Sequence, residues 1–71
     1  MKTIKMHDEL AEKLNDALKA VYEHRYEHAT DVDDEYWRGY GKAIEDTLEF
    51  IGADKTVEWN PLKVIERAMR R

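Results

Sequence analysis

The pattern of apolar and polar positions predicts three helices in this chain of 71 residues. From Asp8 to His28 the apolar residues recur three and four positions apart, so they lie along one side of a helix. A second helix is predicted at about 33–51 and a third at about 61–70. The connection between the first two is short, which favours antiparallel neighbours. The sequence therefore predicts an all-α fold, a small three-helix domain made of an αα-hairpin and a shorter C-terminal helix.

The stretch from Tyr36 to Gly52 contains more than half of the aromatic residues of the chain. Its apolar positions cover about half of the helix circumference, which is more than one neighbouring helix needs. We therefore expect it to be the central helix, contacted on two sides. Gly39 and Gly41 each cost about 1 kcal/mol relative to alanine inside a helix. We expect each glycine to allow a neighbouring part of the fold to approach closely, with a different neighbour at each position.

Residues that favour helix ends mark the predicted boundaries. Asp8 is expected to cap the first helix, and Gly52 fits the left-handed position that ends the second. Asn60 followed by Pro61 is a strong start for the third. Three residues are candidates for the cap of the second helix: Thr30, Asp31 and Asp33.

Two short segments leave their structure open. Thr3–Met6 alternates polar and apolar residues, which suits an extended arm or an early start to the first helix. Thr56–Trp59 suits a short extended link, and the two segments, if both are extended, are able to pair as a minimal ribbon.

The length of the chain allows one domain, spanning 1–71, near the lower limit for a fold held by a hydrophobic core alone. Self-association, which gives a homo-oligomer, is a natural way to enlarge such a core. The predicted core consists of Leu10, Leu14, Leu18, Val21, Trp37, Tyr40, Ile44, Leu48, Phe50, Ile51, Val57, Trp59, Leu62, Ile65 and Met69.

Composition excludes several classes of chemistry. The chain has neither cysteine nor serine, so it has no thiolate or serine nucleophile, and no glycine-rich phosphate loop is present. No cofactor is indicated, and we expect a protein that is not an enzyme. No apolar run approaches the roughly 20 residues that span a bilayer, and the first residues lack the apolar stretch of a signal peptide, so a cytoplasmic protein is expected.

The most specific short motif is His24-x-x-Glu27-His28, the inverted zinc-protease pattern, in which two histidines bind zinc and the glutamate activates water. A metal-binding protein or hydrolase is therefore an alternative function, with Asp31 or Asp33 as an added ligand. Such a site needs a third protein ligand and a substrate cleft, which a chain of this size does not supply. The ordinary interpretation is a pair of histidines that pack or cap the end of the helix.

An acidic cluster precedes the second helix: Asp31, Asp33, Asp34 and Glu35. It lacks the glycine and the final glutamate of a calcium loop. Favourable charge at a helix N-terminus explains the cluster without a metal. If exposed, it is also the densest negative patch available to a basic protein partner.

Two further groups of residues have competing interpretations. Tyr22 and Tyr26, one turn apart, form a contact stripe for a partner if they are exposed, and partial burial is an equally good interpretation. A nucleic-acid binder is the second alternative function, because the third helix ends in basic residues. The helix dipole alone accounts for such residues, and the net charge of −4 disfavours nucleic acid. The basic residues are Lys63, Arg67, Arg70 and Arg71.

The positions Tyr36-x-x-x-Tyr40-x-x-Ala43-Ile44-x-x-x-Leu48, with Gly39 inside them, resemble a segment found in small helical proteins of bacteriophages and mobile elements. The resemblance covers less than a quarter of the chain. It implies a protein that binds a host protein, and in some cases blocks a defence or replication enzyme.

The leading expectation is a non-enzymatic protein–protein interaction module. Its predicted contact residues are those of the acidic cluster together with Tyr22 and Tyr26. Its expected partner is another protein or a second copy of the chain. No contact with a membrane is expected.

Overall fold

A computed structural model describes residues 2–29 and 31–70, with side chains from residue 7 onward. Three helices are present: α1 (Lys2–His28), α2 (Asp34–Phe50) and α3 (Pro61–Met69). The fold is all-α, as predicted, with an antiparallel α1–α2 hairpin and a shorter C-terminal helix. The described residues contain no strand, and none of their helices is both long and apolar enough to cross a membrane.

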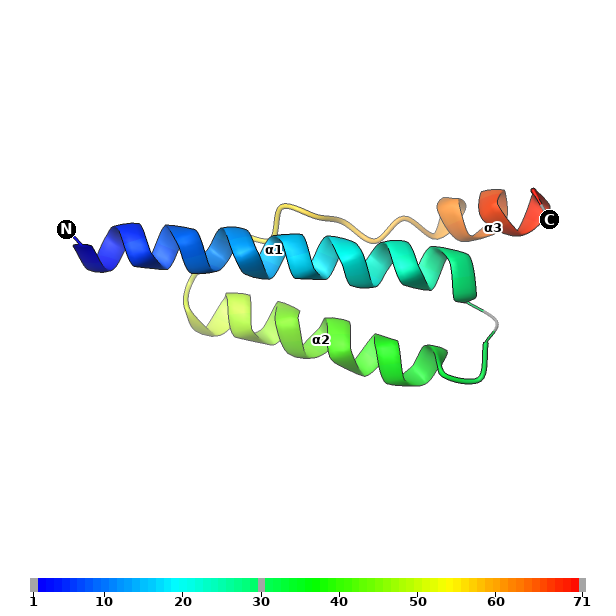
Figure 1. Cartoon of the computed structure of the whole chain (residues 1–71), viewed down its shortest axis with the longest axis horizontal. Coiled ribbons are helices and arrows are strands. Elements are labelled where there is room, and N and C mark those ends of the chain that lie inside the picture. The colour runs from blue at the N-terminus through cyan, green and yellow to red at the C-terminus, as the bar shows by residue number, and fades with distance from the viewer. Residues whose placement is uncertain (1, 30, 71) are drawn as a thin grey trace.

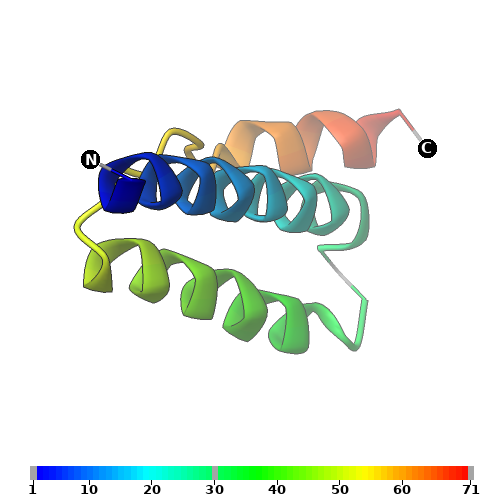
Figure 2. The same ribbon diagram turned by 60° about the vertical axis from the view of Figure 1, so that its left-hand side comes forward.

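The helix at the centre of the fold is α1, so the expectation that the Tyr36–Gly52 helix is central was wrong. α2 and α3 both pack on α1 and do not contact each other. Figure 1 shows α1 between α2 on one side and the link of residues 53–60 with α3 on the other, and Figure 2 shows the same order after rotation. The broad apolar arc of α2 therefore has only one neighbouring helix to cover it.

The three helices lie side by side in one layer, as the view down the shortest axis shows (Figure 1). The principal extents of the Cα trace are 49 × 20 × 13 Å. Most domains bury their apolar faces between two packed layers. A single layer leaves both of its broad faces in contact with solvent.

The first helix begins earlier than predicted, because α1 runs unbroken through residues 3–6 and through Asp8. No proline or glycine interrupts this segment, so nothing local stops the helix at Asp8. The extended-arm alternative for Thr3–Met6 is thus excluded. Thr56–Trp59 lies in the irregular link, where it forms neither helix nor strand.

The predicted ends of α2 are confirmed within a residue. Asp33 holds the N-cap position, although its side chain makes no capping hydrogen bond. The candidate Thr30 lies outside the described residues. At the other end Gly52 has a φ of 74°, and its N–H donates to Glu49 O at 3.0 Å while Ala53 N–H donates to Leu48 O at 2.9 Å. This pair of bonds is the Schellman motif, which satisfies carbonyls that the end of the helix would leave free.

The start of α3 is also confirmed. The Asn60 side chain accepts a hydrogen bond from Leu62 N–H at 3.0 Å, and Pro61 occupies the first helical position. Asn60 thus satisfies one of the free donors at this terminus.

The buried core lies where α2 and the link meet α1. Leu18, Val21, Ile44 and Leu48 are buried as predicted, and two tyrosines join them, Tyr22 at 2 % and Tyr26 at 4 % exposure. The core prediction was wrong for residues on the outer sides of the layer, where no second layer covers them. These exposed residues are Leu10, Tyr40, Phe50, Leu62, Ile65 and Met69.

The two helical glycines of α2 have different surroundings. A Cβ at Gly41 would lie 3.3 Å from Val21 Cγ1 and 3.8 Å from Leu18 Cδ1, so this glycine allows α2 to approach α1 closely. Nothing lies within 4 Å of the corresponding position at Gly39. The expected close approach is confirmed for Gly41 and wrong for Gly39 within a single copy of the chain.

Candidate functional site

Polar side chains of α1 hold the link along the side opposite α2. Asn15, which is buried, donates from Nδ2 to Asp54 O at 3.1 Å and to Ala11 O at 3.0 Å. Its Oδ1 accepts from Thr56 N–H at 2.8 Å. One amide group therefore replaces two of the backbone hydrogen bonds that a neighbouring strand would supply.

Tyr26 makes the equivalent contact one residue before α3. Its hydroxyl accepts from Asn60 N–H at 3.0 Å and donates to Glu58 O at 3.4 Å. Its ring stacks on Trp59, with 4.7 Å between ring centroids. The tyrosine thus fixes both the backbone and a side chain of the link.

Arg25 connects α1 with both the link and α2. Its guanidinium carbon lies 4.1 Å from the ring centroid of Trp59, and its Nε donates to Asp34 Oδ1 at 3.4 Å. The arginine on α1 therefore stacks on the link and pairs with the first residue of α2. Both charged side chains are mostly shielded from solvent, which makes the pair stronger than an ordinary surface ion pair.

Tyr22 lies between α2 and the link. Its hydroxyl donates to Glu45 Oε2, and Lys55 Nζ lies 3.5 Å from the same hydroxyl. Burial raises the pKa of Tyr22, and the hydrogen bond to Glu45 raises it further because it stabilises the protonated phenol. The phenol is a structural donor that stays protonated.

Arg67 anchors α3 to α1. Its guanidinium binds both Glu23, at 3.0 Å, and Glu27, and these hydrogen bonds raise the pKa of Arg67. Val64 packs against the core on the same side of α3. The docking of α3 therefore combines ion pairs with an apolar contact.

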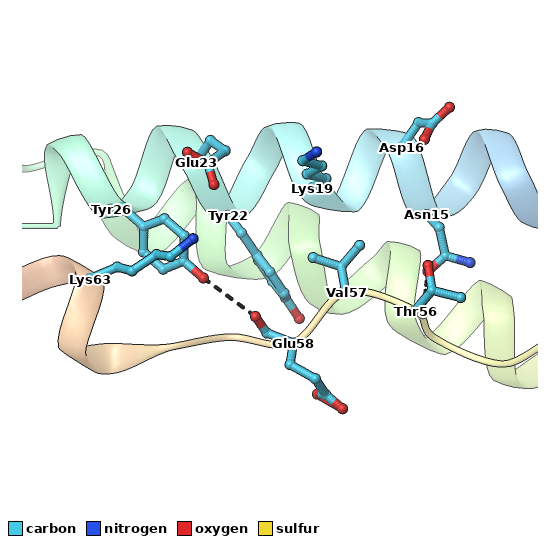
Figure 3. A pocket seen from close by; sticks show the side chains of 10 residues that line it. All are labelled: Asn15, Asp16, Lys19, Tyr22, Glu23, Tyr26, Thr56, Val57, Glu58 and Lys63. Atoms are coloured by element: carbon cyan, nitrogen blue, oxygen red, sulfur yellow. Dashed lines mark hydrogen bonds between the residues drawn. The ribbon is translucent and has the colours of Figure 1, made fainter.

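A cleft of about 440 Å³ lies between α1 and the link (Figure 3). The close-up shows Lys63 reaching across Tyr26, and its Nζ is 5.5 Å from that ring centroid. No buried side-chain nitrogen or oxygen of the described residues lacks a hydrogen-bond partner. Among the lining residues Asn15 and Tyr26 hold the link, and Glu23 binds Arg67 of α3. The lining residues are Asn15, Asp16, Lys19, Tyr22, Glu23, Tyr26, Thr56, Val57, Glu58 and Lys63.

In the inverted zinc-protease motif the glutamate has a different contact from the two histidines. His24 stacks between Trp37 and His28, with ring centroids 4.4 and 4.6 Å apart, and His28 Nδ1 lies 2.8 Å from Asp31 Oδ2. Glu27 instead binds Arg67. Among the described residues no group of three or more potential ligands is placed to hold a metal ion. The geometry agrees with histidines that pack at the end of α1.

The predicted contact residues are divided between surface and core. Asp31, Asp33 and Glu35 are exposed, whereas Asp34 is held by Arg25. Tyr22 and Tyr26 are buried, so of the two interpretations the exposed contact stripe was wrong. Helical spacing alone did not separate them from a surface stripe, because the link that covers them is not a helix.

The basic end of α3 is only partly free. Arg67 is bound to two glutamates, and Arg70 Nη2 lies 3.4 Å from Glu66 Oε1. Lys63 lies over Tyr26. Arg71 lies outside the described residues. The ion pairs of Arg67 and Arg70 offset part of the positive charge that a nucleic acid would need.

The sequence did not reveal that two stripes of apolar residues are exposed on the surface. The α3 stripe consists of Leu62, Ile65 and Met69, which are 70, 56 and 82 % exposed. It points away from α1, because Val64 and Arg67 occupy the docked side of α3. The three-and-four spacing was visible in the sequence, but it indicates only that the face needs a cover.

The α2 stripe consists of Tyr36, Tyr40, Ala43, Thr47 and Phe50, all exposed. Tyr40, Ala43 and Thr47 also line an apolar groove of about 200 Å³ with Leu14 of α1. The Thr47 hydroxyl donates to Ala43 O at 2.8 Å, so its hydrogen-bonding capacity is used within the helix. The stripe is an uncharged surface in a chain with 39 % charged residues.

Comparison of the chain with family models, with curated proteins and with solved structures found no match.

Proposed function

We propose that the chain is a protein-interaction module that binds another protein through the α3 stripe. The observation that carries this proposal is the orientation of α3, which docks on α1 through Arg67 and exposes its most apolar side. Leu62, Ile65 and Met69 have the spacing of anchor residues in a helix that binds a hydrophobic groove. A host protein is the class of partner that the resemblance to bacteriophage proteins implies.

Exposed apolar residues grouped on one helix face are a sign of recognition, whereas scattered ones are ordinary. The accessible surface supports this interpretation. It is 5630 Å² for 8.5 kDa. A compact monomer of this mass exposes roughly 4,700 Å². The extra area is comparable to the share that one protein contributes to a standard interface, about 800 Å².

Site-specific photocrosslinking in living cells tests the proposal. A photoreactive amino acid replaces Ile65 in one variant and Glu12, on an exposed polar side of α1, in the control. The Ile65 variant is expected to give a discrete adduct with one other protein, and the control is expected to give none. The proposal is overturned if the two positions give the same adducts, or if Ile65 gives none.

A further inference from the structure

The α2 stripe is a surface separate from the α3 stripe, and it has a regular spacing of its own. The five positions are spaced four, three, four and three residues apart, which is the seam of a helix that packs lengthwise on another helix. The seam is centred on Ala43 and its two ends match in size, although the inner pair, Tyr40 and Thr47, differ in size. Aromatic rings, Tyr36 and Phe50, stand at the two ends, and the smallest side chain stands at the middle.

We propose that a second copy of this chain packs antiparallel on the α2 stripe and supplies the second layer that the fold lacks. A two-fold axis near Ala43 places this alanine beside its own copy and brings Tyr36 against Phe50 of the second copy. The smallest side chain then meets its own copy at the axis, Tyr40 lies against Thr47 of the second copy, and aromatic rings fill the ends. A seam that is nearly palindromic is complementary to itself, as an isologous interface requires.

Gly39 supports the same arrangement. It lies on the outer flank of the stripe, in the middle of a helix, with nothing within 4 Å of where a Cβ would stand. A glycine costs about 1 kcal/mol there, and no contact inside one copy compensates for that cost. A second helix backbone that approaches this flank explains the absence of a side chain.

The charges beside the stripe fit an antiparallel copy. Lys42 and Asp46 lie on the outer flank, one turn apart, with Nζ 3.7 Å from Oδ1. The two-fold axis near Ala43 brings Lys42 of one copy level with Asp46 of the second copy, within two residues along the helix. Opposite charges at the rim fix the register, although they add little affinity.

The second copy would cover more than α2. Leu14 of α1 lines the groove beside the stripe, so part of α1 would also be covered. The stacked hairpins form a four-helix arrangement, in which α1 and α2 both gain a second layer.

Sedimentation velocity, together with single-cysteine crosslinking, tests the proposal. The unmodified chain is expected to sediment as a dimer, and Ala43→Glu is expected to raise the Kd by roughly 30-fold or more, because it buries an unpaired charge at the axis. Ile65→Glu on the α3 stripe is the matched control and should leave the dimer intact. Circular dichroism of each variant shows whether its helices are retained.

The absence of native cysteine makes the crosslink specific. Ala43→Cys should give a disulfide-linked dimer under mild oxidation, because Cβ atoms at the axis come within the roughly 4 Å that a disulfide spans. Glu12→Cys, on a different side of α1, should not. A monomeric unmodified chain, a dimer that Ala43→Glu leaves unchanged, or equal crosslinking at both cysteines would each overturn the proposal. None of these outcomes bears on the α3 stripe, whose adducts with another protein are a separate measurement.

Discussion

The two sides of α1 are covered in different ways. On one side α2 packs a helix against a helix, and Gly41 lets apolar side chains from both meet closely. On the other side an extended link lies along the helix, where the side chains of Asn15 and Tyr26 bind its backbone groups. The first side is stabilised mainly by burial of apolar surface, whereas the second combines burial of Val57 and Trp59 with side-chain hydrogen bonds to backbone groups.

This difference affects how each side responds to change. Helix packing is destabilised when the volume of a buried side chain is reduced or increased, because the interior is closely packed. The link detaches from α1 when a hydrogen-bond partner is removed. It can detach while the helices stay folded, since water reaches the freed backbone groups.

Leu48→Ala should have the largest effect. Leu48 is 1 % exposed in the core, and its truncation should cost about 2–5 kcal/mol of unfolding free energy. That is comparable to the whole stability of a domain of this size, so the variant should be largely unfolded. Urea denaturation of dilute protein measures the loss. Phe50→Ala, at a position 90 % exposed, is the control and should change stability by no more than about 0.5 kcal/mol.

Gly41→Leu should destabilise the helix-packed side by roughly 1–3 kcal/mol, despite the better helix propensity of leucine. Its side chain would start 3.3 Å from Val21 Cγ1, so α2 must move away from α1. Gly39→Leu, where that space is empty, is the matched control and should be at least as stable as the unmodified chain in dilute solution. A Gly41→Leu variant that melts at or above the unmodified temperature would show that the two helices are not closely packed there.

Asn15→Ala should loosen the link side while leaving the α1–α2 hairpin folded. Three hydrogen bonds disappear, and the expected cost is about 1–2 kcal/mol because water replaces part of them. In hydrogen exchange, the substitution should accelerate exchange of the Thr56 amide more than exchange of the amides of α2. Uniform acceleration across the chain would mean that both sides of α1 unfold together. Asp16→Ala, on the exposed neighbour, should leave the Thr56 amide unchanged.

Tyr22→Phe gives the smallest effect and probes the contact between the two sides at alkaline pH. Because the pKa of Tyr22 is raised in the folded chain, its contribution to stability is present below the ordinary tyrosine pKa of about 10 and is lost as the pH rises above it. The stability of the unmodified chain should therefore fall more steeply between about pH 9 and 11 than that of Tyr22→Phe. Tyr36→Phe, at a side chain 65 % exposed, should keep the steep fall.

The sequence predicted those features that depend on neighbouring residues. The end of α1 at His28, the left-handed Gly52 and the Asn60–Pro61 start of α3 all follow from backbone groups that must be satisfied locally. The close contact at Gly41 was also foreseen, since a costly residue inside a helix needs a compensating neighbour. Asp8 was not a boundary, because a cap residue ends a helix only where the chain turns.

The tertiary structure decided which helix is central and which apolar faces are covered. An amphipathic stripe shows that a face needs a cover, but it carries no information about what provides it. The stretch from Tyr36 to Gly52 therefore looked like the centre of the fold, while α1 became the centre through the polar side chains of Asn15, Arg25 and Tyr26. Those side chains bind an extended segment distant in sequence, and such contacts have no period that the sequence could reveal. The same physics leaves the α2 and α3 stripes exposed, because one layer of helices covers only the sides that face within it.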